Sequence, residues 1–110
     1  MSPVEDCVFL YLGSDNSVEI ENLIDKTNDD AEVKTATVEL TELQDADSGV
    51  PIVGVSLPVS MPQVGATNNY RGNIVDGASL TEGQRVDMTI EADDGANRLR
   101  KFRTTAIVKA

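Results

Sequence analysis

Apolar side chains recur at every second position in several segments of this chain. In the segment 53–61, each odd position is apolar and each even position is small or polar. Successive side chains of a β-strand point to opposite faces of a sheet, so this alternation predicts a strand with one apolar face. Pro58 and Pro62 fall on the polar side of the pattern and cannot donate ladder hydrogen bonds, which favours an edge strand or a bulge.

Six further segments show alternating or continuous apolar patterns, which brings the predicted strands to about seven. They are 7–12, 17–23, 36–40, 69–75, 86–92 and 102–108. The near-continuous apolar run at 7–12 predicts a strand covered on both faces. Strands spaced roughly 8–15 residues apart, separated by turn-forming residues, are typical of an antiparallel β-sandwich. Helix is expected at most as a single turn within 76–83.

Two of these strands have a clear inward face. Within 17–23, the alternation turns Val18 and Ile20 inward and leaves Glu19 and Glu21 on a solvated face. Within 69–75, the positions that share one face are Tyr70, Gly72 and Ile74. Paired acids such as those at 19 and 21 occur in glycosidases, but the chain has no Trp and few aromatic residues to bind a sugar.

The composition limits the chemistry that the chain can perform. Its 110 residues predict one domain, spanning 1–110. It has no His, so no Ser-His-Asp triad, Cys-His pair or His-ligated metal is expected. The single Cys7 lies in an apolar run and reads as a buried structural thiol rather than a nucleophile. We therefore expect no enzymatic activity, no cofactor and no metal site.

The net charge of -10 is unevenly distributed. Residues 1–47 contain thirteen acids against two lysines, a net charge of −11, and the remainder contains six acids against seven bases, a net charge of +1. This balance argues against a nucleic-acid-binding protein and against docking on anionic membranes. The bases of the second half concentrate at 98–103.

Three interpretations of this basic segment stay open: a solubilising surface, a contact with DNA, and an assembly contact. Net charge weighs against DNA. Rings of identical subunits bury two different patches at each contact, and these patches can carry opposite charges. For such a ring, the candidate interface residues are Asp29, Asp30, Glu32, Arg98, Arg100, Lys101 and Arg103, the acids of one subunit facing the bases of the next.

Two acidic turns raise the question of calcium. The segment 45–49 has acidic residues at alternate positions, as at the start of a calcium loop, but it lacks the later ligands of an EF-hand. The segment 93–97 contains an Asp-Gly hairpin signal. Both are expected to be acidic turns, and a weak calcium site would require the two to meet at one end of the sandwich.

Two stretches resemble Ig-like modules. The stretch 38–54 resembles their strand–turn–strand opening and includes the step Pro51-Ile52-Val53-Gly54. The segment 80–84, with the strand at 86–92, looks like their E–F corner and F strand. This resemblance implies a generic Ig-like sandwich without the Cys…Trp…Cys signature of antibody domains.

The chain as a whole is similar to small structural proteins of tailed bacteriophages and prophages. The resemblance is carried by 12–16, 69–71, Leu80 and the C-terminal strand. It implies a non-enzymatic virion protein, made in the bacterial host cytoplasm, that contacts other virion proteins and at most lets DNA pass through a lumen. A head–tail connector (stopper or neck ring) is the first expectation. Capsid decoration and a cellular Ig-like binding module are the alternatives.

Overall fold

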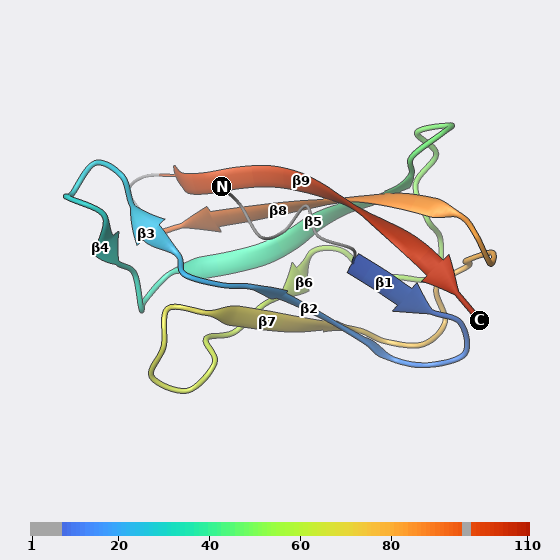
Figure 1. Cartoon of the computed structure of the whole chain (residues 1–110), viewed down its shortest axis with the longest axis horizontal. Coiled ribbons are helices and arrows are strands. Elements are labelled where there is room, and N and C mark those ends of the chain that lie inside the picture. Colours follow the sequence, from blue (N-terminus) through green and yellow to red (C-terminus); the bar gives the residue numbers. More distant parts are fainter. Residues whose placement is uncertain (1–7, 96–97) are drawn as a thin grey trace.

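The computed structural model describes residues 8–95 and 98–110, and its regular structure is entirely β (Figure 1). The strands are β1 (Val8–Tyr11), β2 (Asn16–Ile20), β3 (Ile24–Asp25), β4 (Ala31–Glu32), β5 (Thr37–Asp45), β6 (Val59–Ser60), β7 (Tyr70–Ile74), β8 (Arg85–Asp93) and β9 (Arg98–Lys109). The expected all-β class is therefore confirmed. The described residues include no helical turn within 76–83, and no helix long and apolar enough to cross a membrane.

The main sheet is a mixed, strongly curled half-barrel in the order β1-β9-β8-β5-β6. Two small sheets, β2-β7 and β3-β4, complete the fold. It is not a clear Ig-like sandwich, and the expectation of a purely antiparallel arrangement is wrong because β1 runs parallel to β9. Register shifts between Leu40 and Glu42 and between Ala92 and Asp93 interrupt the long strands, and such bulges increase the local twist and bend of a sheet.

The core fills the concave side of the half-barrel. On β8, the alternating side chains of Val86, Met88, Ile90 and Ala92 are buried, as the predicted strand at 86–92 requires. The members of the core are Leu10, Val18, Ile20, Leu23, Val38, Leu40, Leu43, Ile52, Met61, Tyr70, Ile74, Val86, Met88, Ile90, Ala92, Ala106 and Val108. The inward faces predicted for β2 and β7 are confirmed by this set.

The predicted strand at 53–61 is mostly wrong, since only Val59 and Ser60 pair as a strand. Gly54 takes a positive φ of 88°, which extended strands do not use, and Val53 is 67% exposed. The two ends of this stretch are tied to β5 by backbone bonds: Ile52 donates to Leu43, and Met61 donates to Val38. The region between them is therefore mostly irregular and lies along the edge of β5, with which only Val59–Ser60 pairs as a strand.

β1 is covered on one face, not on both as predicted. Leu10 is completely buried, whereas Tyr11 is 47% exposed. The Asn16 side chain occupies the edge of β1 away from β9, because it accepts from the Tyr11 N–H at 2.8 Å and donates to the Tyr11 carbonyl at 3.2 Å. The prediction of a buried thiol at Cys7 lies outside the described residues.

Candidate functional site

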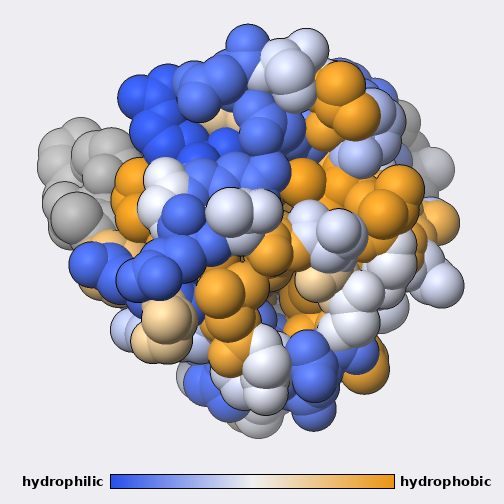
Figure 2. Space-filling view, turned by 90° about the vertical axis from the view of Figure 1, so that its right-hand side faces the viewer, coloured by the Kyte–Doolittle hydropathy of each residue, from blue (hydrophilic) through white to orange (hydrophobic). Residues whose placement is uncertain are grey.

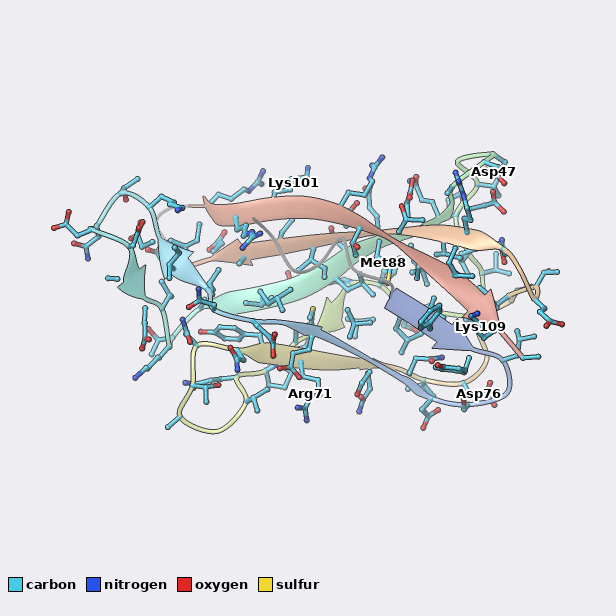
Figure 3. All side chains as sticks on the ribbon, viewed as in Figure 1. Asp47, Arg71, Asp76, Met88, Lys101 and Lys109 are labelled. Carbon is cyan, nitrogen blue, oxygen red and sulfur yellow. The ribbon has the colours of Figure 1, made fainter. Side chains whose placement is uncertain are left out.

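The convex face of the main sheet places the predicted basic residues beside acids of the same chain. The register sets Lys101 opposite Glu91 and Arg103 opposite Thr89 on neighbouring strands. These side chains belong to the outward set of β8 and β9, because the intervening β8 positions fill the core. Figure 3 shows Lys101 projecting from β9 on the outer side. The convex face is therefore polar, with its bases concentrated on β9.

The outward bases of β9 form ion pairs across the strands. Arg98 lies 3.2 Å and Lys101 lies 4.0 Å from carboxylate oxygens of Glu91, and Arg103 lies 3.7 Å from Glu42. Each of these three basic side chains is more than half exposed. Exposed pairs of this kind typically contribute about 0.2–1 kcal/mol. The bases are thus only weakly engaged and accessible from outside.

Arg100 differs from the other three predicted bases. The register places it opposite the buried Ala92, on the inward set of β9, and its side chain is half-buried. Sequence reasoning grouped it with the exposed bases because the four residues are close in the chain. The bulge at the start of the β8–β9 ladder changes the facing of residues there, and local alternation does not reveal it.

The predicted acids lie together at the β3–β4 turn. Asp29 and Asp30 adopt positive φ angles of 51° and 55°, which Asp tolerates better than most residues. Asp30 pairs with Lys26 at 3.7 Å. Glu32 pairs with Lys34 at 3.6 Å. All three acids are exposed. Within 8–95 and 98–110, no recorded ion pair joins these acids to the bases of β9.

The two predicted patches start at the same end of the elongated molecule, and the basic one continues toward the middle of the sheet. Figure 1 shows β3, β4 and the start of β9 together at one end of the long axis, which measures 42 Å. We call the three acids 29, 30 and 32 the acidic turn, and the outward bases 98, 101 and 103 the basic strand. The acidic turn lies at this end, whereas the basic strand starts near it and extends to the middle of β8, where Arg103 lies opposite Thr89.

An exposed apolar surface at the opposite end was not predicted as a site. Figure 2 shows apolar residues gathered at the end near the C-terminus. Val75 is 68% exposed and borders a groove of about 360 Å³ together with Gly54, Val55 and Asp76. A smaller pocket joins Val75 to Tyr11 and Leu12. We call this the apolar end. The alternation at 53–61 concealed it, because Val53 was assigned to a buried strand face.

The turn at 45–49 is held by its own first carboxylate. Asp45 Oδ1 accepts the backbone N–H groups of Asp47 at 2.8 Å and Ser48 at 3.0 Å, and Oδ2 accepts from Gln84 Nε2 at 2.7 Å. The Gln84 bond, followed by the Ser48 and Asp47 backbone bonds, lowers the pKa of Asp45 below its ordinary value. The carboxylate therefore serves the turn itself.

The turn at 45–49 does not meet residues 93–95 of the turn at 93–97, whose residues 96 and 97 lie outside the described part of the chain. The β5–β8 register places Asp45 opposite Val86 and Asp93 opposite Thr37, so the turns lie at opposite ends of this ladder. Eight residues of strand separate them, which is about 26 Å. No group of three potential metal-ligating side chains occurs in the described part of the chain.

Comparison with protein-family models, with curated proteins and with solved structures gave no match.

Proposed function

We propose that the chain is a non-enzymatic structural subunit of a tailed-phage particle, and specifically a head–tail connector protein that assembles in a ring. One observation carries the proposal: the acidic turn and the basic strand are both exposed, the acidic turn and the start of the basic strand lie at one end of the molecule, and no ion pair joins them among the described residues. The resemblance to small phage structural proteins supplies the biological setting.

Ring symmetry explains how two patches at one end can meet. Rotation about a ring axis keeps equivalent elements of all subunits at the same height. If the long axis of each subunit runs roughly along the ring axis, the acidic turn of one subunit lies level with the start of the basic strand of the next. Opposite charges then meet side to side at every contact. The acid-rich first half of the chain would face a lumen through which DNA passes without adhering.

The test is assembly as a function of charge and salt. Purified protein, alone and with its neighbouring virion proteins, is examined by mass photometry between 50 and 300 mM NaCl. We expect closed oligomers at low salt that dissociate as salt rises, because exposed charges are screened. Reversal of Lys101 and Arg103 to Glu should abolish the oligomers, and adding Asp29→Lys and Asp30→Lys to that variant should restore them. A monomer under all conditions would refute the ring.

The apolar end favours a second candidate, a capsid decoration or cement protein. Val53 and Val75 expose more than half of their surface, and exposed apolar patches often mark contact sites. A decoration protein would seat this end on a capsid. In that case Val75→Asp would abolish capsid binding, whereas the charge reversals would leave it intact. An Ig-like cellular binding module would show neither behaviour.

A further inference from the structure

One edge of β9 is left open by the described strands over much of its length. β8 pairs with β9 from Arg98 to Ile107, whereas β1 pairs only from Ala106 to Lys109. Between Arg98 and Thr105, no strand within residues 8–95 or 98–110 adds to the second edge. Such an edge offers a row of backbone donors and acceptors to an incoming strand.

The direction of each backbone group on β9 follows from two hydrogen bonds. Leu12 donates to the Lys109 carbonyl at 2.9 Å, so position 109 faces β1. Val108 donates to the Gln84 carbonyl at 3.0 Å, so position 108 faces the β8 side. These directions alternate along an antiparallel strand, and the ladder has no register shift between Arg100 and Ile107. The N–H and C=O groups of Lys101 and Arg103, and the N–H of Thr105, therefore point to the open edge, while the Thr105 C=O lies where the pairing with β1 begins.

The side chains beside this edge select the charge of a partner. The stretch Arg98–Thr105 contains four bases and no acid, in a chain whose net charge is -10. Side chains directly opposite each other on paired strands lie about 4.5–5.5 Å apart at Cβ. Carboxylates on an added strand would thus contact Lys101 and Arg103 on the convex face. A second β9 edge would be repelled there, because like charges would meet.

The inward side chains of β9 determine which residues an added strand can carry between its carboxylates. Thr104 and Ala106 are buried on the concave side of β9. An added strand places every second side chain on this side, at the margin of the apolar core. Small apolar residues suit these positions because a charge there would be partly desolvated.

We propose that the open edge of β9 binds an extended segment of a partner protein that carries carboxylates at alternate positions and apolar residues between them. The segment adds a strand along Lys101–Thr105 and ends where β1 begins. This inference rests on the proposed function in treating β9 as a contact surface, but it requires a backbone ladder in addition to charge. Strand addition uses main-chain bonds for affinity and side chains for selectivity.

The experiment uses the full chain and a fluorescent peptide of sequence Thr-Glu-Val-Glu-Val-Glu-Thr, with fluorescence anisotropy at 50 mM NaCl. The control peptide replaces each Glu by Lys. Arg103→Pro removes one N–H from the open edge and leaves the β8 ladder intact, because position 103 does not bond to β8. Arg103→Ala removes the charge and keeps the N–H. Thr105→Pro is the alternative edge variant if Arg103→Pro does not fold, as judged by thermal melting.

We expect the acidic peptide to bind and the lysine peptide not to bind. Arg103→Pro should weaken binding about tenfold. Arg103→Ala should weaken it about threefold and reduce its salt dependence. Amide hydrogen exchange at Lys101, Arg103 and Thr105 should slow when the peptide is bound, while exchange at Thr104 stays unchanged.

Five results would overturn the inference. The acidic peptide does not bind at 1 mM, or both peptides bind equally, or the folded proline variants bind as well as the wild type. If the acidic peptide binds only to a variant that lacks residues 1–7, the occupant of the β9 edge is the chain's own first segment. If the proline variants lose their oligomers while peptide binding is unchanged, the occupant is a second copy of the chain. Both of these would also overturn it. Peptide binding by a chain that never forms oligomers refutes the ring and leaves this inference standing.

Discussion

The Tyr70 hydroxyl bridges two backbone groups of the segment that connects β4 to β5. It donates to the Val33 carbonyl at 2.9 Å and accepts the Ala36 N–H at 3.2 Å. The ring itself is 1% exposed and belongs to the core. Replacing Tyr70 by Phe keeps the ring and removes both bonds, so the change isolates the hydroxyl.

The expected loss follows from the groups left behind. A buried donor or acceptor without a partner costs about 1–3 kcal/mol. Val33 and Ala36 are half-buried, so water reaches them in part. We therefore expect Tyr70→Phe to lower the free energy of unfolding by about 1.5–3 kcal/mol. For 110 residues the unfolding entropy is about 0.23 kcal/mol/K, so the melting temperature should fall by roughly 6–13 °C.

Thermal unfolding followed by circular dichroism measures this shift, and urea unfolding gives the free energy. Tyr11→Phe is the matched control, because Tyr11 is 47% exposed and its hydroxyl has no recorded hydrogen bond to another described residue. The control should change stability by less than about 0.5 kcal/mol. A shift of less than about 3 °C for Tyr70→Phe would refute the bridging role, as would equal shifts for the two variants.

Three further outcomes are expected. Gly54→Ala should lower the free energy of unfolding by about 2–4 kcal/mol, because the φ of Gly54 is 88° and an added Cβ would collide with the Gly77 carbonyl. The control Gly49→Ala, at a φ of 75° with open space around the added Cβ, should lower it by only about 1 kcal/mol. Equal urea midpoints for the two variants would contradict the collision. Asp45→Asn should lower the urea midpoint at pH 7, because Gln84 cannot reverse its amide while its Oε1 accepts from Thr81. Because the pKa of Asp45 is lowered in the folded state, its carboxylate stabilises the fold above the ordinary pKa of 3.8, and this contribution is lost as pH falls through the lowered pKa. The difference in urea midpoint between Asp45→Asn and the wild type should therefore vanish in strong acid. A difference that persists in strong acid, or an equal difference for Glu82→Gln, would contradict the role of the Asp45 carboxylate. Millimolar calcium should shift the melting temperature by less than about 1 °C, and a rise above about 3 °C would show a stabilising site.

The sequence predicted the strands whose two faces meet different environments. β5 and β8 each have one face in the core and one face toward solvent, so alternation in the chain reproduces alternation in space. The same reasoning identified Tyr70, Gly72 and Ile74 as one buried face. These predictions depend only on local periodicity, which a single sequence contains.

Features that depend on distant pairing were not predictable in this way. Nothing near residue 8 indicates that β1 runs parallel to β9, since the partner lies about a hundred residues away. Alternation at 53–61 was overridden by the positive φ of Gly54 and by ties of the segment's ends to β5. For the same reason, the apolar end could not be separated from the core before the fold was known.

The candidate site shows both limits in one place. Clustering of bases at 98–103 was visible in the sequence, but their partners Glu91 and Glu42 were set by strand register. These pairs reduce the positive charge of the basic strand but do not neutralise it, because the single carboxylate of Glu91 pairs with both Arg98 and Lys101. Each exposed pair contributes at most about 1 kcal/mol, so a carboxylate from a partner can share or replace Glu91 at small cost. Contacts through this strand should therefore form and dissociate readily with salt, and lasting attachment requires the additional backbone bonds of the open β9 edge.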